Sequence, residues 1–255
     1  MSLDLVIVPC LEDNYAFLIH DSDTGSTALF DAPDDRPITL ALEKRGWNLT
    51  EIFLTHHHAD HIDGVAVLRE QFNPRVIGAA RDAQRLPRLD VEVMPGDVVS
   101  FSGHDVTVID AAGHTSGHIA FNMPDAGCAF TGDSLMALGC GRLFEGSAQD
   151  MWGTLQRLAA LPDDTLICSG HEYTTANAKF AQSIEPDNPW LKERMADISE
   201  AREKGRPTVP SMLDMEKATN PFLRANLPEV KALLGMAEAD DVTVFAEIRA
   251  RKDNF

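Results

Sequence analysis

The chain has 255 residues, of which 40 are acidic and 22 basic, so its formal net charge is −18. A chain of this length can bury about three quarters of its unfolded surface, which is enough for one large domain or two modest ones. Proteins that bind a phosphate backbone usually carry the opposite charge, so we expect no nucleic-acid partner.

Membrane association and export are not expected either. No apolar stretch approaches the roughly 20 residues that span a bilayer. The N-terminus, Met1-Ser-Leu-Asp-Leu, lacks the basic start and apolar stretch of an export signal. The cysteines are scattered without metal-ligand spacing, at Cys10, Cys128, Cys140 and Cys168. We therefore expect reduced, mostly buried thiols and a cytoplasmic location.

Short strand-like segments alternate with turns from Leu3 to about Gly170. They are residues 5–8, 16–20, 27–31, 51–55, 76–79, 98–101, 106–110 and 119–123. Helices are expected at residues 65–72 and 147–161, the second with Ser147 and Asp150 suited to its N-terminal cap. This mixture of elements predicts an α/β domain.

A histidine-rich loop at residues 55–64, here called the metal loop, joins the strand-like segment 51–55 to the helix expected at 65–72. It contains the pattern H-x-H-x-D-H at His56, His58, Asp60 and His61. Imidazole and carboxylate groups are ligands that zinc, iron and manganese all accept. In an extended segment residues two apart point to one face, so His56 and His58 can converge on one ion. Asp60 and His61 lie further along and could reach a second ion.

Three more segments place a ligand-type side chain where a strand gives way to a glycine-containing turn. These side chains are His114, Asp133 and His171. With the metal loop they make seven candidate ligands, more than one tetrahedral zinc requires. The sequence therefore predicts a site for two metal ions.

Strand signals nearly vanish after Tyr173. Helices are expected at residues 175–184, 189–203 and 240–251, and the proline-containing stretch 205–228 is expected to be a loop. We therefore predict a metal-binding α/β domain at residues 1–172 and a small helical domain at residues 173–255.

The chain resembles the metallo-β-lactamase superfamily and, within it, the glyoxalase II (hydroxyacylglutathione hydrolase) family. The matching motifs are residues 9–15, the metal loop, and residues 113–118, 139–146, 170–174, 220–224 and 249–255. The segment 139–146 and the basic C-terminal tail indicate the glutathione thioesterase branch. The resemblance implies an αββα sandwich followed by an all-helical C-terminal domain that helps to bind glutathione.

The implied reaction is hydrolysis of S-D-lactoylglutathione and related 2-hydroxyacyl glutathione thioesters to the hydroxy acid and glutathione, the second step of methylglyoxal detoxification. By resemblance, one metal is held by His56, His58 and His114, the other by Asp60, His61 and His171, and Asp133 bridges the two. Zinc is expected, with iron or manganese as alternatives. Asp60 and Asp133 are then the catalytic carboxylates, because the two ions they help to hold would supply the attacking hydroxide.

The resemblance also implies substrate-binding residues. They are Arg142, Phe144, Tyr173, Arg249 and Lys252. Where many members of the family have Lys and Tyr, this chain has Arg142 and Phe144. Arg keeps the positive charge and can bind a carboxylate through two hydrogen bonds, whereas Phe cannot donate one. We expect the protein to be a monomer.

Two other functions stay open. The first is an oxidoreductase of the persulfide dioxygenase type, which also resembles the superfamily but uses one iron and does not need Asp60, His61 and His171 as a second site. The second is a metal-dependent binding protein without catalysis. For the tail at residues 240–251, the alternative to substrate binding is a solvated charged helix. Supporting or packing roles are expected for His57 and His118.

Overall fold

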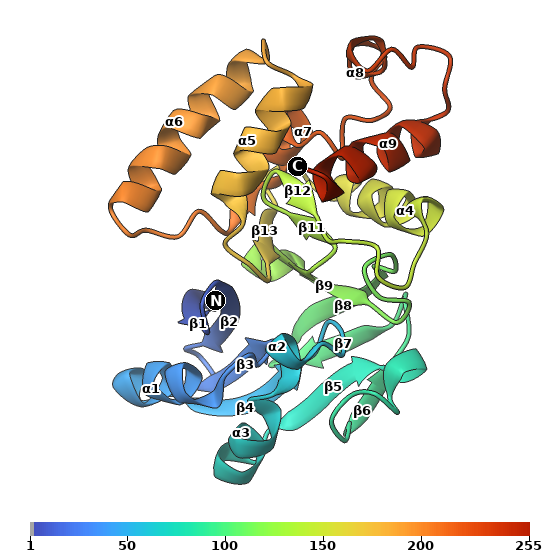
Figure 1. Ribbon diagram of the computed structural model, residues 1–255. Coiled ribbons are helices and arrows are strands. Elements are labelled where there is room, and N and C mark those ends of the chain that lie inside the picture. The colour runs from blue at the N-terminus through green and yellow to red at the C-terminus, as the bar shows by residue number, and fades with distance from the viewer. Residues whose placement is uncertain (1–2) are drawn as a thin grey trace. The chain divides into compact units, whose positions relative to one another are not determined.

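The computed structural model of the chain describes residues 3–255, which form two compact units. The first unit extends to Asp110 and also contains Gly117–Gly132, and the second comprises Ala111–Ser116 and Asp133–Phe255. Figure 1 shows the elements in chain order. Within residues 3–255, no helix combines the length and apolar character needed to cross a membrane.

A six-stranded sheet, with its strands in chain order, forms the base of the first unit. The strands are β1 (Leu3–Cys10), β2 (Asn14–Asp21), β3 (Ser26–Phe30), β4 (Asn48–Phe53), β5 (Arg75–Ala79) and β6 (Val91–Val93). The first three strands pair antiparallel, and the pairs from β3 to β6 are parallel. Because neighbouring parallel strands run in the same direction, the carboxyl ends of β3 and β4 meet at one edge, where the metal loop begins.

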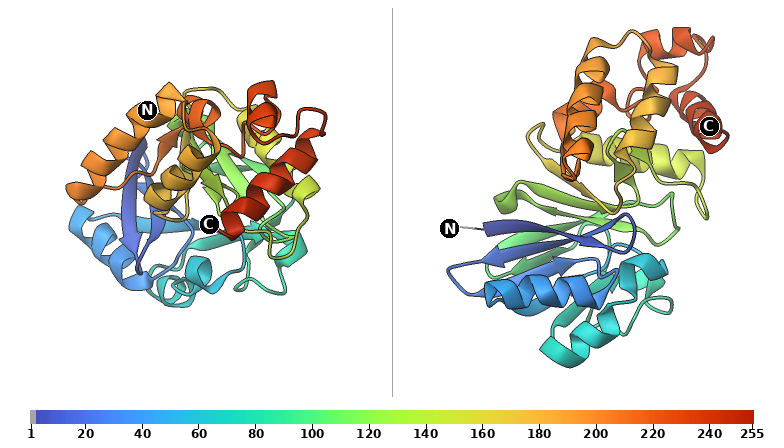
Figure 2. Two further views of the ribbon diagram at one scale, coloured as in Figure 1. Left: turned by 45° about the horizontal axis from the view of Figure 1, so that its top comes forward. Right: turned by 60° about the vertical axis from the view of Figure 1, so that its left-hand side comes forward.

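Two helices cover one face of this sheet (Figure 2, right). They are α1 (Asp35–Arg45) and α3 (Val65–Phe72), and the single turn α2 (Ala59–Ile62) precedes α3. The Asp34 side chain accepts a hydrogen bond from the Arg36 N–H and so caps α1, which ends at Gly46 in the left-handed conformation, φ 67°. Ile38 and Leu42, one turn apart on α1, are fully buried in the core against the sheet.

A second layer of strands completes the first unit. In chain order they are β7 (Val98–Phe101), β8 (His104–Asp110), β9 (Ile119–Met123) and β10 (Cys128–Gly132), with 3-10 turns at Ala80–Asp82 and Pro124–Ala126. These strands pair antiparallel in the order β10-β9-β8-β7. The Phe30 ring of the first sheet stacks on Phe130 of the second, with centroids 3.5 Å apart, and Phe53 meets Phe121 edge-on at 5.2 Å. The two sheets of this unit therefore share a phenylalanine core.

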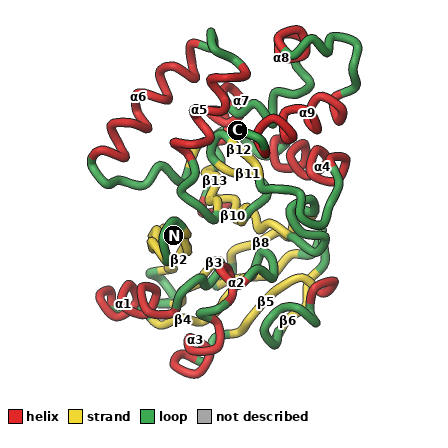
Figure 3. The backbone as a smooth tube through the Cα atoms, in the orientation of Figure 1, coloured by secondary structure: helices red, strands yellow, loops and turns green. Residues whose placement is uncertain are grey.

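The second unit is mostly helical (Figure 3). Its strands form two short pairs, β11 (Leu135–Met136) with β12 (Gly139–Cys140), and β13 (Leu166–Ser169) with β14 (Ser211–Met212). Its helices are α4 (Ala148–Ala159), α5 (Thr174–Ile184), α6 (Pro189–Glu203), α7 (Leu213–Thr219), α8 (Pro228–Leu233) and α9 (Asp241–Asp253). Ser147 and Asp150 form the capping box predicted for α4.

Most elements predicted from the sequence are confirmed. The strands at residues 98–101 and 119–123 and the helices at 65–72 and 189–203 have the predicted bounds. The prediction of a loop over residues 205–228 is wrong, because it contains β14 and α7. The prolines that led to this prediction flank α7 at Pro210 and Pro221 and do not interrupt it. Helix α1 was also missed; its Pro37 lies in the first turn, where proline is tolerated.

Candidate metal-binding residues and substrate pocket

The metal loop leaves the end of β4 and is anchored by a carboxylate from the end of β3. Asp31 accepts hydrogen bonds from the Thr55 N–H and from the Thr55 hydroxyl, each 2.8 Å long. Since the Thr55 hydroxyl proton is donated to Asp31, its oxygen can only accept from His56 Nδ1, 3.0 Å away. This network leaves a lone pair on His56 Nε2, which lies 3.1 Å from His58 Nδ1.

Asp31 also orients His61, a role that the sequence analysis missed. Its Oδ2 accepts a 2.8 Å hydrogen bond from His61 Nδ1, which leaves the other ring nitrogen of His61 available as a ligand. The side chains of Asp31, His56 and His61 are buried and offer ligand atoms within 4.8 Å of one another. Asp31 has φ 56°. The sequence offered one signal for this role of Asp31. It is an acidic residue directly after a parallel strand, and that strand lies next to the strand that leads into the metal loop.

A side chain of β2 holds Asp60 in place. The Asn14 side chain donates to the Asp60 carbonyl oxygen at 3.0 Å and to its carboxylate at 3.1 Å. Asp60 Oδ2 lies 3.9 Å from His61 Nε2. The structure therefore brings all four predicted ligands of the metal loop into one part of the first unit.

The other three predicted ligands come together in the second unit. Asp133 Oδ2 lies 3.4 Å from His114 Nε2 and 3.3 Å from His171 Nε2. All three side chains are buried. Asp133 follows β10 and His171 follows β13, as the sequence predicted.

His114 is fixed by backbone contacts around the turn after β12. Its Nδ1 donates a 2.8 Å hydrogen bond to the Arg142 carbonyl, which can only accept, so the neutral ring has a lone pair on Nε2. A Cβ on Gly141 would lie 2.0 Å from the Asp133 carbonyl oxygen and 2.8 Å from His114 Nδ1. Glycine is therefore required at position 141 for this close approach.

The donor atoms in both units fit a divalent cation. A neutral His114 presents a lone pair to a carboxylate oxygen, an arrangement that is repulsive unless a proton or a cation lies between the two atoms. Tetrahedral ligands about 2.05 Å from zinc are roughly 3.3 Å apart. The His56–His58 separation of 3.1 Å and the two Asp133–imidazole separations of 3.4 Å and 3.3 Å are close to this value.

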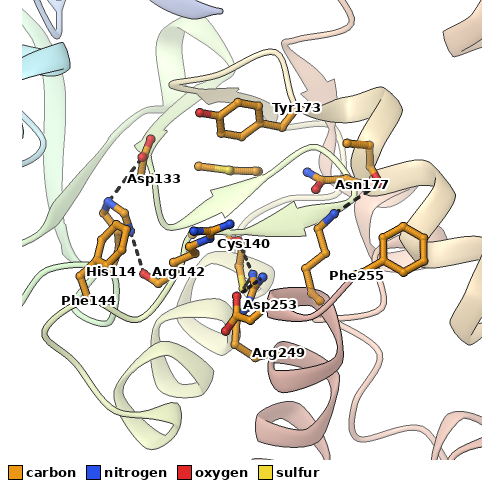
Figure 4. Close-up of a pocket in the computed structure, with 14 residues that line it drawn as sticks. His114, Asp133, Cys140, Arg142, Phe144, Tyr173, Asn177, Arg249, Asp253 and Phe255 are labelled. Atoms are coloured by element: carbon orange, nitrogen blue, oxygen red, sulfur yellow. Dashed lines mark hydrogen bonds and ion pairs between the residues drawn. The ribbon is translucent and has the colours of Figure 1, made fainter.

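A cavity of about 570 Å³ opens beside His114 and Asp133 in the second unit (Figure 4). All five residues predicted to bind substrate line it: Arg142, Phe144, Tyr173, Arg249 and Lys252. The Tyr173 ring stacks on His171 with centroids 4.7 Å apart, and the Phe144 ring lies 5.2 Å from His114.

The cations of this cavity differ in how firmly they are held. Arg249 is buried and donates to the Cys140 carbonyl at 2.9 Å and to Asp253 at 2.8 Å. Lys252 Nζ lies over the rings of Phe180 and Phe255, 5.3 Å and 5.5 Å from their centroids. Partial burial, and then the charges of nearby arginines, lower the pKa of Lys252. Positive charge is thus concentrated locally in a strongly acidic chain.

The cysteine in the cavity lacks the lowered pKa of a reactive thiolate. Burial raises the pKa of the Cys140 thiol to about 11, although Arg249 beside it acts in the opposite direction. The thiol is therefore protonated near neutral pH. Among residues 3–255 all four cysteines are buried, as predicted.

The remaining histidines have supporting contacts. His57 pairs with Asp82 at 3.3 Å, and the His118 ring stacks on His56 with centroids 4.7 Å apart. His20 stacks on Trp47, and His104 lies 2.7 Å from an Asp125 oxygen. These contacts agree with the packing and supporting roles expected for His57 and His118.

Comparison with known proteins identifies the family. The model of the metallo-beta-lactamase superfamily matches residues 12–171, and the model described as hydroxyacylglutathione hydrolase C-terminus matches residues 172–255. The chain belongs to the hydroxyacylglutathione hydrolase family. It is 61% identical to the hydroxyacylglutathione hydrolase of Ruegeria pomeroyi over 100% of both chains. It is 53% identical to that of Rhizobium meliloti over 100% of this chain and 99% of the other.

Solved structures with a similar fold are also found. The B3 metallo-beta-lactamase BLEG-1 has a TM-score of 0.68 at 18% identity, covering 86% of this chain and 99% of its own, which shows the fold alone. ETHE1 from Myxococcus xanthus has a TM-score of 0.66 at 26% identity, covering 99% and 98%. TTHA1623, solved in a di-iron-bound form, has a TM-score of 0.55 at 26% identity, covering 66% and 91%.

The predicted family and fold class are therefore confirmed: a metallo-beta-lactamase domain precedes the C-terminal part typical of hydroxyacylglutathione hydrolases. That part is helical apart from the short strand β14. Because hydroxyacylglutathione hydrolases are thioester hydrolases, the chain is an enzyme of this class. The family and the clustered His and Asp side chains imply divalent metal ions.

Proposed function

We propose that the chain hydrolyses S-D-lactoylglutathione and related 2-hydroxyacyl glutathione thioesters to the hydroxy acid and glutathione, the second step of methylglyoxal detoxification. The observation that carries this function is the 61% identity, over the whole of both chains, to a hydroxyacylglutathione hydrolase. A cavity with several cations beside candidate metal ligands suits an anionic substrate.

The seven predicted ligands would hold two divalent ions. His56, His58 and His114 would hold one, Asp60, His61 and His171 the other, and Asp133 would bridge them with its two carboxylate oxygens. Such ions polarise a carbonyl group and lower the pKa of water. The assignment is supported by the ligand spacing within each unit and by the di-iron-bound form of TTHA1623. We propose zinc, with iron or manganese as alternatives, because mixed His and carboxylate ligands accept all three.

The residues of the chain position both the ions and the substrate. Asp60 and Asp133 are the proposed catalytic carboxylates, and Asn14 orients Asp60 through two hydrogen bonds. Arg142 and Lys252 would bind carboxylates of the glutathione moiety, because both line the cavity. Buried Arg249 would contribute mainly through its charge, since Cys140 and Asp253 already occupy two of its nitrogens.

Two aromatic residues would contact the rest of the substrate. Phe144 is 63% exposed at the cavity and cannot donate a hydrogen bond, so it would pack against the thioester. Tyr173 stacks on His171 and would limit the movement of that ring. The leaving thiol of glutathione has a pKa near 8.5, so its departure as a thiolate does not require a dedicated general acid.

We also propose a cytoplasmic monomer without nucleic-acid or membrane partners. Four buried cysteines without disulfide bonds among residues 3–255 support a reducing compartment. The net charge of −18 disfavours a phosphate backbone as a partner. We propose residues 1–172 as the catalytic domain and 173–255 as the domain that contributes to glutathione binding.

A direct assay tests the function. Protein with quantified metal content is mixed with several glutathione thioesters, and loss of thioester absorbance is followed. S-D-lactoylglutathione should be hydrolysed efficiently and without oxygen consumption. Oxygen consumption with glutathione persulfide, together with inert thioesters, would show that the chain is a dioxygenase instead.

A further inference from the structure

The short hairpin β11–β12 (residues 135–140) lies between two parts of the candidate active site. Asp133 comes two residues before its first strand, and Arg142 follows its second strand by two residues. The open end is closed by a 3.1 Å hydrogen bond from the Gly141 N–H to the Ser134 carbonyl. A shift of the hairpin would therefore displace Asp133 and Arg142 together.

The tip of the hairpin is inserted into the helices that follow it in the chain. Leu138 is fully buried with apolar side chains of α5 and α6, namely Ala178, Ala181, Leu191 and Ile198. Its φ is 55°, in the left-handed region that branched residues rarely adopt. A leucine remains in such a conformation only where its surroundings hold it.

Polar groups of α7 and of Asn220, the residue after this helix, hold the tip of the hairpin in place. Glu216 accepts a 2.8 Å hydrogen bond from the Leu138 N–H. Asn220 donates to the carbonyl oxygens of Met136 and Gly139, at 3.1 Å and 3.0 Å, and thus contacts both strands of the hairpin. Glu216 and Asn220 are completely buried.

The two polar side chains depend on each other and on one cation. The Asn220 amide nitrogen also lies 3.0 Å from Glu216 Oε2, so its two N–H groups are shared among three acceptors, while its own carbonyl oxygen accepts from the Phe222 N–H at 3.0 Å. Arg194 of α6 pairs with the other oxygen of Glu216. An aspartate at position 220 could not donate to the two carbonyls and would face another carboxylate. The network therefore requires an amide at this position.

We propose that Asn220 and Glu216 are positioning residues of the active site, which act through the β11–β12 hairpin to hold Asp133 and Arg142. The proposal rests on the proposed function. The helical C-terminal part of the chain would then do more than bind substrate, because it would also fix a metal ligand and a substrate-binding cation. Displacing reacting groups by about 1 Å can lower a rate roughly a hundredfold.

Asn220→Ala tests the proposal, and Glu185→Gln is a matched control. Glu185 is buried and pairs with Arg224 through contacts of 2.8 Å and 2.9 Å. Within residues 3–255 its hydrogen bonds do not involve the hairpin. Both variants lose contacts in the same unit, and urea unfolding identifies conditions in which both are folded.

Under those conditions, Asn220→Ala should lose metal to a chelator about tenfold or more faster than wild type. It should also raise KM and lower kcat/KM for the thioester at least about tenfold. Glu185→Gln should stay within about twofold of wild type in each measurement. Equal effects in the two variants, or wild-type metal retention and KM in Asn220→Ala, would overturn the proposal.

If Asn220→Ala does not fold, Leu138→Ala tests the same inference from the tip of the hairpin. It should show the same faster metal loss and higher KM, and unchanged values would contradict the inference. The metal measurement does not depend on the substrate. A wild-type protein inactive on every thioester would therefore refute the proposed function, while the retention of metal would still test the role of the hairpin.

Discussion

Asp31 Oδ2 accepts a hydrogen bond of 2.8 Å from His61 Nδ1, linking the end of β3 to the metal loop. The same carboxylate holds both the N–H and the hydroxyl of Thr55. One buried acidic side chain thus sets the orientation of a candidate metal ligand and of the residue that precedes the first histidine of the loop. In metal sites, such contacts fix which ring nitrogen is free to bind.

Asp31→Ala should therefore weaken metal binding without removing a proposed ligand. Loss of a carboxylate partner of a ligating histidine typically costs about 10- to 100-fold in metal affinity. Elemental analysis after dialysis against a graded series of chelator concentrations measures this change. Asp34→Ala is the control, because Asp34 caps α1, and it should lower stability by about 1 kcal/mol while metal is retained. Equal metal content in the two variants would contradict the role of Asp31.

Asp133→Ala should abolish turnover and reduce the amount of bound metal. Asp133 Oδ2 lies within 3.4 Å of both His114 Nε2 and His171 Nε2, and alanine leaves those nitrogens without their shared acidic partner. Metal quantification and thioester hydrolysis are measured on the same preparation. Wild-type activity in this variant would end the assignment of Asp133 as a bridging ligand.

Replacing Arg249 and Lys252 together with alanine should raise KM far more than it lowers kcat. Cations that bind the anionic part of the substrate equally in the ground state and the transition state affect KM alone. Lys252→Ala should show this effect in isolation. Arg249→Ala should also lower the unfolding midpoint, because buried Arg249 bonds to the Cys140 carbonyl. Unchanged kinetics in the double variant would mean that the tail has no role in substrate binding.

Substrate binding should weaken as pH rises, and the weakening should begin at a lower pH than it would if Lys252 had the pKa of an ordinary lysine. The pKa of Lys252 is lowered by burial first, and then by the charges of Arg249 and Arg142. As pH rises through this lowered value, Lys252 loses its charge and KM should increase. Lys252→Arg should remove the rise, because arginine stays protonated. If KM rises in the same way at alkaline pH in wild type and in Lys252→Arg, the rise is caused by another titrating group.

The lowered pKa of Lys252 also makes the stability of the folded state depend on pH. The folded state binds this proton more weakly than the unfolded state, so protonated Lys252 opposes folding at every pH below its folded pKa. The opposition is relieved as pH rises from that value to the ordinary value of 10.5. The free energy of unfolding of Lys252→Met relative to wild type, measured with urea, should therefore be constant below this window and fall as pH rises through it. A difference that is constant with pH would exclude this linkage.

The candidate ligands could be named from the sequence. Ligand character belongs to a side chain itself, and the H-x-H-x-D-H spacing at residues 56–61 is set by local backbone geometry. Strand ends followed by glycine turns similarly marked His114, Asp133 and His171. The strand at residues 119–123 and the helix at 189–203 were predictable because the patterns that mark them are local.

Only the tertiary structure decided which distant groups support these residues. Asp31 reaches His61 because β3 and β4 are parallel neighbours. Asn220 holds a hairpin more than eighty positions before it, and the basic tail contains one buried and one half-buried cation, Arg249 and Lys252. A buried carboxylate or amide must find a partner, but which one it finds depends on packing between segments far apart in the chain.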